Sequence, residues 1–466
     1  MTAVDVVIMA AGKGTRMKSR TPKVLHRLGG RPLIQHVIDT ASALGARRTI
    51  VITGHGADDV EGWLRASSAA AGRASPDFVR QEPQLGTGHA VQQVVPVLPD
   101  DGIALILNGD VPLVRTQTLR ALVDACAGRN LALLTVDMAD PAGYGRIVRE
   151  GDVVRAIVEH KDASDAQKAI REVYTGFMAV PSQRLKQWLA RLTNDNAQRE
   201  YYLTDIVGFA AADGCQVVAT KASEQVEVDG VNSPLQLAEL ERAYQLRQAR
   251  ALMEQGVRLA DPARLDVRGK LECGQDVDID VNCVFEGSVA LGDNVRIGAN
   301  CVIANARVAA GAVIHPFTHI DGEQAAVEVG EGALVGPFAR LRPGAKLGAE
   351  VHIGNFVEVK NATLARGAKA NHLAYLGDAS VGERVNYGAG SITANYDGAN
   401  KHRTVIEADV HVGSNCVLVA PVTVGAGGTV GAGSVVNKST EPGALTVARA
   451  RQASIPNWNR PKKGAK

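Results

Sequence analysis

Short aliphatic runs alternate with helical patterns over the first half of the chain. Gly30–Leu44 has the spacing of a helix. Four other runs have the length and continuity of buried strands: Val4–Ala10, Thr49–Thr53, Ile103–Leu107 and Leu131–Val136. Buried strands separated by helices are typical of a parallel sheet with crossover helices. The pattern therefore predicts an α/β domain over residues 1–232.

A long helix is expected after this domain. Ser233 can serve as its N-cap, Pro234 as its first helical residue and Gln236 as the second member of a capping box. Gly256 stands where helices commonly end. About 22 residues at 1.5 Å each span roughly 33 Å. Residues 233–256 are therefore predicted to form an arm between two domains.

From about Asp266 onward, aliphatic residues recur every six positions. The period runs through Leu291–Ile303, Val329–Val359 and Ile406–Val436, and residues around Ala394–Lys401 interrupt it like a loop insertion. A period of six belongs neither to a helix nor to a simple amphipathic strand. It is typical of a parallel β-helix, in which each hexad forms one strand and one corner and three hexads complete a coil.

The composition agrees with such a repeat. Aromatic residues make up only 4% of the chain, and more than half of its 49 glycines lie after Asp266, where small residues let flat strands turn. The balance of 51 Lys+Arg against 49 Asp+Glu argues against nucleic-acid or membrane-surface binding driven by bulk charge. Six Cys with no CxxC or Cys/His cluster exclude a zinc ribbon and a dense disulfide scaffold.

One stretch could be mistaken for a membrane span. His411–Asn437 contains no Asp, Glu, Lys or Arg. Its glycines and its fixed short apolar interval favour the β-helix instead. Met1–Met17 does not have the pattern of a secretory signal. We therefore expect a cytoplasmic protein with no membrane partner.

A glycine-rich loop with nearby cations follows the first strand. Glycines such as those of Gly12-Lys13-Gly14 let backbone N–H groups approach phosphates. The loop has neither Walker A nor dinucleotide-fingerprint spacing, and alone it indicates only a strand-to-helix turn. Arg16 and Lys23 add two cations, which suit a triphosphate and the pyrophosphate that leaves it. Asp110 follows a buried strand, where α/β sheets bind ligands, and its hard oxygens suit Mg²⁺.

Together these motifs resemble those of the sugar-nucleotide pyrophosphorylases. The motifs occur in the same order as in that family. They are the glycine-rich loop, Pro22-Lys23, Gln84–Ala90, Asn108-Gly109-Asp110, Gly143–Ile147, Glu159-His160-Lys161 and Val228–Asn232. Joined to hexapeptide repeats, they resemble the bacterial family that combines an N-acetylglucosamine-1-phosphate uridyltransferase with a glucosamine-1-phosphate N-acetyltransferase. The resemblance covers about residues 4 to 455. It implies an α/β Rossmann-like nucleotidyltransferase domain (1–232), a linker helix (233–256) and a left-handed parallel β-helix (257–466).

For the first domain the resemblance implies transfer of a uridylyl group from UTP to a sugar 1-phosphate. Such chemistry needs positioning and charge neutralisation rather than a covalent intermediate. Arg16 and Lys23 would act on phosphates, and Asp110 with Asn232 would hold Mg²⁺. Gly145 and Glu159 would hold the acetylated sugar. Tyr174 departs from the family, which often has Asn there. The full implied substrate set is Met9, Ala10, Ala11, Gly12, Lys23, Gln81, Gly86, Thr87, Asn108, Gly109, Asp110, Gly145, Glu159, Tyr174 and Asn232.

For the second domain the resemblance implies acetyl transfer with His372 as catalytic base. Taken alone, a single His on a β-helix is more often an ordinary surface residue, but this one stands where the hexad step is disturbed. An imidazole can take a proton from an amine at physiological pH. The implied glucosamine-phosphate or acyl contacts are Arg342, Lys360, Tyr375, Asn386, Asn395 and Tyr396, and the implied acetyl-CoA contacts are Ala389, Ser414, Ala432 and Arg449.

The expected enzyme is therefore bifunctional. It acetylates glucosamine 1-phosphate with acetyl-CoA, then converts the product with UTP into UDP-N-acetylglucosamine, which feeds peptidoglycan and lipopolysaccharide synthesis. The resemblance also implies a homotrimer, with small molecules and no nucleic acid as partners. Two alternatives stay open: a monofunctional nucleotidyltransferase whose β-helix only assembles or regulates, and a non-enzymatic scaffold. His372 and its neighbours argue against the first, and the set around Lys23 and Asp110 argues against the second.

Overall fold

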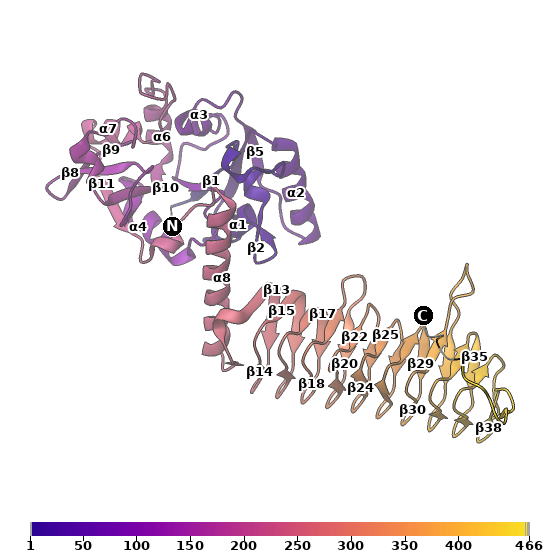
Figure 1. Cartoon of the computed structure of the whole chain (residues 1–466). Coiled ribbons are helices and arrows are strands. Elements are labelled where there is room, and N and C mark those ends of the chain that lie inside the picture. Colours follow the sequence, from indigo (N-terminus) through magenta and orange to yellow (C-terminus); the bar gives the residue numbers. More distant parts are fainter. Residues whose placement is uncertain (1, 462, 464–466) are drawn as a thin grey trace. The chain divides into compact units, whose positions relative to one another are not determined.

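The computed structural model describes residues 2–461 and residue 463. The chain forms two compact units, Met1–Tyr244 and Gln245–Lys466, each described by itself (Figure 1). The division falls within helix α8 (Pro234–Glu254), inside the segment predicted as a linker. The exact domain boundaries stay a prediction. Among the described residues, no helix is both long and apolar enough to cross a membrane.

Unit 1 is built on a nine-stranded sheet whose main path is β11-β7-β10-β6-β1-β4-β5. The strand β1 lies between β4 and β6 and is parallel to both. The strands are β1 (Val4–Met9), β4 (Arg48–Thr53), β5 (Asp77–Arg80), β6 (Ile103–Asn108), β7 (Leu131–Asp137), β8 (Arg146–Glu150), β9 (Val153–Val158), β10 (Glu172–Pro181) and β11 (Val217–Lys221), with a separate small hairpin of β2 (Arg27–Leu28) and β3 (Arg31–Pro32).

The four strands expected from the sequence run in one direction, but the sheet as a whole is mixed. Strand β10 runs antiparallel to both of its neighbours, β6 and β7, and β8 and β9 form an antiparallel hairpin beside it. Strand β10 is almost continuously buried. An antiparallel strand that is covered on both faces has the same unbroken apolar run as a parallel one, so the local pattern does not reveal its direction.

Helices cover both faces of this sheet. Side chains of β1 alternate between two cores: Val7 lies in the cluster beneath α3, α6 and α7, whereas Val6 and Ile8 lie in the one beneath α1, α2 and α4. The helices are α1 (Leu33–Ser42), α2 (Ala57–Ala70), α3 (Thr87–Gln92), α4 (Thr116–Cys126), α5 (Asp165–Lys168), α6 (Ser182–Leu189) and α7 (Asp205–Ala212).

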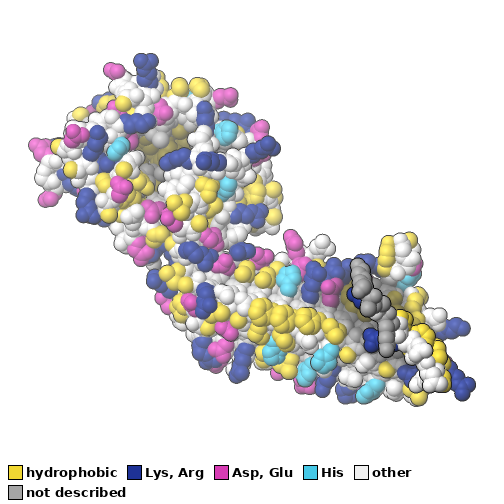
Figure 2. Space-filling view, in the orientation of Figure 1, with side chains coloured by type: hydrophobic (Ala, Val, Ile, Leu, Met, Phe, Trp, Pro, Cys, Tyr) yellow, Lys and Arg dark blue, Asp and Glu magenta, His cyan; other side chains and the backbone are white. Residues whose placement is uncertain are grey.

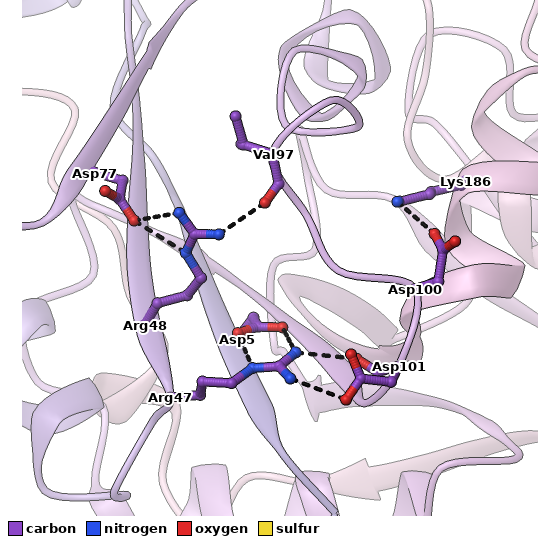
Figure 3. A network of polar contacts seen from close by, with 8 residues as sticks. All are labelled: Asp5, Arg47, Arg48, Asp77, Val97, Asp100, Asp101 and Lys186. Carbon is purple, nitrogen blue, oxygen red and sulfur yellow. Dashed lines mark hydrogen bonds and ion pairs between the residues drawn. The ribbon is translucent and has the colours of Figure 1, made fainter.

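A polar network fixes the amino end of β1 (Figure 3). The guanidinium of Arg47 donates to both oxygens of Asp5, at 2.9 and 2.5 Å, and to Asp101 at 2.9 Å. The side chain of Asp5 is 0% exposed, so its carboxylate depends on Arg47 for a counter-charge. The neighbouring Arg48 pairs instead with Asp77, which is half exposed.

Unit 2 is a coil of short parallel strands, as the hexad period predicted. Residues paired on neighbouring strands are mostly 17 or 18 positions apart, as for His352 and Lys369. The longer step from Ile392 to Val417 contains the expected insertion loop. Inward aliphatic side chains such as Ile353 are buried. The left-handed sense of the coil, which came from the resemblance, stays a prediction.

The strands of unit 2 fall into two sheets. The first contains β12 (Arg258–Leu259), β14 (Asp278–Ile279), β16 (Arg296–Ile297), β18 (Val313–Ile314), β21 (Leu334–Val335), β24 (His352–Asn355), β27 (Lys369–His372), β30 (Asn386–Tyr387), β33 (His411–Val412), β36 (Thr429–Val430) and β38 (Leu445–Thr446). The second contains β13 (Leu265–Cys273), β15 (Cys283–Leu291), β17 (Val302–Val308), β19 (His319–Asp321), β20 (Val327–Val329), β22 (Arg340–Leu341), β23 (Lys346–Leu347), β25 (Glu358–Lys360), β26 (Thr363–Leu364), β28 (Tyr375–Gly377), β29 (Ala379–Val381), β31 (Ile392–Ala394), β32 (Thr404–Ile406), β34 (Val417–Val419), β35 (Val422–Val424) and β37 (Val435–Val436).

One corner of the coil carries a row of exposed hydrophobic side chains. The row consists of Phe317, Phe338, Phe356 and Leu373, which are 47% to 62% exposed and occupy successive coils. The ring of Phe338 stacks on the rings of Phe317 and Phe356, and its centroid lies 4.9 and 5.4 Å from theirs, respectively. All four residues have positive φ, between 50° and 62°. Bulky residues disfavour this conformation, so the row is held at a cost to stability.

The visible surfaces of both units carry charges of both signs (Figure 2). Lys and Arg side chains alternate with Asp and Glu rather than gathering in one large patch, and hydrophobic side chains follow the β-helix as a band. This distribution agrees with the near-zero net charge of +2.

We expect Arg47→Met to lower the free energy of unfolding of unit 1 by about 3 kcal/mol, because it leaves the Asp5 carboxylate buried without its partner. Arg48→Met is the matched control and should cost at most about 1 kcal/mol, because Asp77 reaches solvent. Urea unfolding followed by the fluorescence of Trp63 and Trp188 measures both variants. Equal losses would contradict the role assigned to Asp5.

Candidate functional site

A cavity of about 370 Å³ lies at the carboxyl ends of β1 and β6. Met9 and Asn108 are register partners, so the glycine-rich loop and Asp110 begin side by side. The predicted residues that line the cavity are Met9, Ala10, Ala11, Gly12, Lys23, Gln81, Gly86, Thr87, Asn108 and Asp110. Val24, Gln84, Ala90 and Glu200 also line it and were not predicted. Gln84 and Ala90 lie within the quoted 84–90 motif, whereas no sequence signal pointed to Glu200.

The loop after β1 is shaped by its glycines. Gly14 has φ 58°, and a Cβ atom there would lie 2.8 Å from Cβ of Lys23, so only glycine lets the loop close on that side chain. At Gly12 nothing lies within 4 Å of the same position. Arg16 is exposed on the following turn, Thr15–Met17, outside the residues that line the cavity. Gly109 is also outside that set, and its N–H donates to the carbonyl of Met9 at 2.9 Å.

Lys23 joins the two residues predicted to hold a metal. Its ammonium donates to Oδ2 of Asp110 at 2.5 Å and to Oδ1 of Asn232 at 3.1 Å. Asn232 is held by the first turn of α8, because its N–H donates to Oε1 of Gln236 at 2.9 Å. The N–H of Gln236 donates to Oγ of Ser233 at 3.3 Å. Gln236 thus takes part in the cap of α8 and also holds Asn232, a predicted site residue, in place.

The oxygens of Asp110 and Asn232 fit Mg²⁺. Both are hard ligands, and because one ammonium contacts both, they converge on a single position. One carboxylate and one amide leave coordination positions for phosphate oxygens and water, as is usual for Mg²⁺ beside phosphates. In the part of the chain that the structure describes, no group of three or more His, Cys, Asp or Glu side chains forms a metal site.

Gly145 and Glu159, the residues predicted to hold the sugar, are neighbours. A Cβ atom at Gly145 would lie 2.7 Å from Cγ2 of Ile157 and 3.7 Å from Oε1 of Glu159, so no side chain fits there. Oγ1 of Thr204 donates to Oε1 of Glu159 at 3.0 Å. Burial raises the pKa of the Glu159 carboxyl, and the hydrogen bond from Thr204 offsets this only in part.

Tyr174 joins this region through its backbone. Its N–H donates to the carbonyl of Gly145 at 2.9 Å. Its side chain is buried in the same core cluster as Ile157, and its hydroxyl has no hydrogen-bond partner among the described residues. Burial raises the pKa of the Tyr174 phenol well above its ordinary value. The side chain of Tyr174 thus fills the core beside this region.

In unit 2, His372 ends β27 with its side chain exposed. Its Nδ1 lies 2.9 Å from Oδ1 of Asn355, which can only accept a hydrogen bond. In the neutral ring the proton therefore sits on Nδ1, and Nε2 is left with the lone pair that a general base needs.

The residues predicted to bind acetyl-CoA lie along the corner that carries His372. Ala389, Ser414 and Ala432 occupy successive coils, linked by backbone hydrogen bonds of 2.8 to 3.1 Å between each coil and the next. Nη1 of Arg449 donates to the carbonyl of Ala432. Together they form one edge that leads away from the imidazole.

Three cations gather on the neighbouring face. Nη1 of Arg342 donates to Oε1 of Glu358 at 2.8 Å. Lys401 contacts Lys360 and lowers the pKa of its ammonium, and desolvation and Arg342 add to the effect. Two ammonium groups this close favour an anion between them. Lys401 was not predicted, although its place in the Ala394–Lys401 insertion was the signal that could have identified it.

The remaining predicted residues of this site separate into two groups. Tyr375 and Asn395 converge over Gly377: a Cβ atom there would meet both the hydroxyl of the first and the amide of the second. Tyr396, by contrast, is exposed and donates to the carbonyl of Gly398 at 2.6 Å within its own loop. Asn386 is exposed on β30.

Comparison with known families agrees with both units. Residues 6–259 match the MobA-like NTP transferase domain. Residues 326–361 match the bacterial transferase hexapeptide of six repeats, and residues 274–305 and 403–438 match the hexapeptide repeat of succinyl-transferase.

Curated relatives match the whole chain. "Bifunctional protein GlmU" of Paracidovorax citrulli is 72% identical over 473 residues, with 99% of each chain covered. The protein of the same name from Polaromonas naphthalenivorans is 73% identical over 464 residues, covering 99% of this chain and 98% of the relative. That of an Azoarcus species is 57% identical over 462 residues, covering 99% and 100%. The resemblance inferred from the motifs is thereby confirmed, and the chain belongs to the GlmU family of bifunctional proteins.

Proposed function

We propose that the chain makes UDP-N-acetylglucosamine at two separate sites. Unit 2 transfers an acetyl group from acetyl-CoA to glucosamine 1-phosphate, and unit 1 transfers a uridylyl group from UTP to the acetylated product. The observation that carries the proposal is that each unit has its own reacting set. The first unit has Lys23 between Asp110 and Asn232, and the second has His372, held by Asn355, together with the cations around Lys360.

In the uridylyl reaction, an oxygen of the sugar 1-phosphate attacks the α-phosphorus of UTP and pyrophosphate leaves. Lys23 forms an ion pair with Asp110. Triphosphate oxygens would draw its ammonium away and free Asp110 and Asn232 for Mg²⁺. When bound there, Mg²⁺ supplies charge neutralisation at the phosphates. Arg16 adds a second cation for the leaving pyrophosphate.

In the acetyl reaction, the amine nitrogen of glucosamine 1-phosphate attacks the thioester carbonyl. The new C–N bond forms as the C–S bond breaks, the amine proton passes to Nε2 of His372, and the thiolate of coenzyme A leaves. Lys360, Lys401 and Arg342 offer an anion site for the sugar phosphate. No described Cys lies in this set, so transfer is direct.

The same proposal includes a homotrimer. Its support is the exposed row of Phe317, Phe338, Phe356 and Leu373, which repeats once per coil. A second β-helix has the same axial repeat and can match every member of the row. The row ends beside His372, so the acyl site would border another copy. Because UTP and acetyl-CoA are cytoplasmic metabolites, we propose that the enzyme acts in the cytoplasm.

We expect His372→Ala to lower acetyl transfer at least about a hundredfold, because the amine loses its base. Uridylyl transfer should stay near the wild-type rate, since the reacting set of unit 1 is intact. Assays of both half-reactions measure this, with His319→Ala, an exposed His on β19, as the matched control. Equal loss of both activities would refute the two-site proposal.

We expect Phe338→Ser to shift the protein from the mass of three 48.9 kDa chains toward one, because it removes the central ring of the stacked row. Val153→Ser, at a similarly exposed position in unit 1, should leave the mass unchanged. Light scattering coupled to size-exclusion chromatography reports both masses. A wild-type chain that is monomeric at micromolar concentration would contradict the homotrimer.

A further prediction concerns Glu159. Because its pKa is raised by burial, its protonated form is favoured in the folded state, and this stabilisation is lost as the pH rises through the folded pKa. Glu159→Gln should therefore unfold at a higher temperature than wild type near about pH 8, and the advantage should vanish near about pH 4. Glu150→Gln, an exposed position on the same hairpin, is the control. A pH-independent difference would contradict the assigned cause.

A further inference from the structure

Arg146 is a buried cation that forms no ion pair with the described residues. Its side chain is 1% exposed, and no described carboxylate forms an ion pair with it. Nη1 donates to the carbonyl of Tyr144, Nη2 donates to Nδ1 of His160 at 3.2 Å, and Nε has no partner. Burying a charge in this way is costly, so stability alone does not explain the residue.

The partners of Arg146 flank the residues assigned to the sugar. Gly145 lies between Tyr144 and Arg146, and Glu159 directly precedes His160. Arg146 and Val158 are the last register partners of the β8–β9 hairpin. The pairing of β8 with β9 thus ends directly before Gly145 on one side and Glu159 on the other. Beyond this pair, the hydrogen bond from Arg146 to His160 links the two sides.

We infer that Arg146 and His160 form a clamp that positions Gly145 and Glu159 around the sugar. The inference rests on the proposed function, since it takes both residues as sugar contacts. Arg146 and His160 act through their neighbours and are positioning residues. The rigid fork of a guanidinium reaches the Tyr144 carbonyl and the imidazole at once, which the single ammonium of a lysine does not.

The clamp also fixes the tautomer of His160. Because Nδ1 accepts from Arg146, the ring proton lies on Nε2. An asparagine places its amide oxygen near the position of Nδ1 and can accept the same hydrogen bond. A phenylalanine keeps the ring and loses the acceptor. The two substitutions therefore distinguish the effect of losing the hydrogen bond from the effect of changing the volume of the side chain.

The test uses the full chain and the variants His160→Phe, His160→Asn and Arg146→Lys. We expect His160→Phe to raise KM for N-acetylglucosamine 1-phosphate about tenfold, with KM for UTP and acetyl transfer changed less than about twofold. His160→Asn should stay within about threefold of wild type, and Arg146→Lys should resemble His160→Phe. Equal rises of both KM values, or a His160→Asn variant as impaired as His160→Phe, would overturn the clamp.

A second measurement needs no substrate. The amide of Tyr174 donates to the carbonyl of Gly145, so its hydrogen exchange reports whether the Gly145 segment is held. We expect at least tenfold faster exchange in His160→Phe and little change in His160→Asn. Unchanged exchange in every variant would contradict the clamp even if the kinetics agree. A wild-type chain that does not use N-acetylglucosamine 1-phosphate would instead refute the proposed function, and the exchange data would still decide the clamp.

Discussion

Parallel strand pairing brings the candidate residues of each unit together. In unit 1, the register that sets Met9 opposite Asn108 starts two loops at one edge of the sheet, and the loops carry Lys23 and Asp110 to within 2.5 Å. In unit 2, pairing at steps of 17 or 18 residues stacks equivalent corner positions on each other, so His372 and Ala389 lie on adjacent coils. In both units, backbone hydrogen bonds bring together residues that are far apart in the sequence.

The two sites differ in the groups that surround their cations. Lys23 is neutralised by a carboxylate and an amide oxygen, so a phosphate has to compete for it. Lys360 and Lys401 instead face each other, and their mutual repulsion lowers the pKa of Lys360. An anion arriving between Lys360 and Lys401 relieves a repulsion, whereas one arriving at Lys23 replaces an existing partner.

Features that depend on local pattern could be predicted from the sequence. The buried strands, the start of α8 and the hexad coil follow from residue spacing and capping chemistry. The direction of β10 could not be predicted, because a strand that is buried on both faces has the same continuous apolar run whether it is parallel or antiparallel to its neighbours. The hydrogen bond from Asn232 to Gln236 and the placement of Lys401 beside Lys360 depend on tertiary packing. The motifs identified most of the residues that line the unit 1 cavity, but the buried position of the Tyr174 side chain required the fold.

The left-handed corners of the hydrophobic row also bear on how this sequence can change over time. Glycine and asparagine adopt this backbone conformation with less strain than bulky residues. Replacing Phe317, Phe338 or Phe356 by either residue would therefore lower the backbone strain. Drift under selection for folding alone would therefore erode the row. The backbone energy of the isolated coil therefore does not explain why bulky side chains stand at these corners.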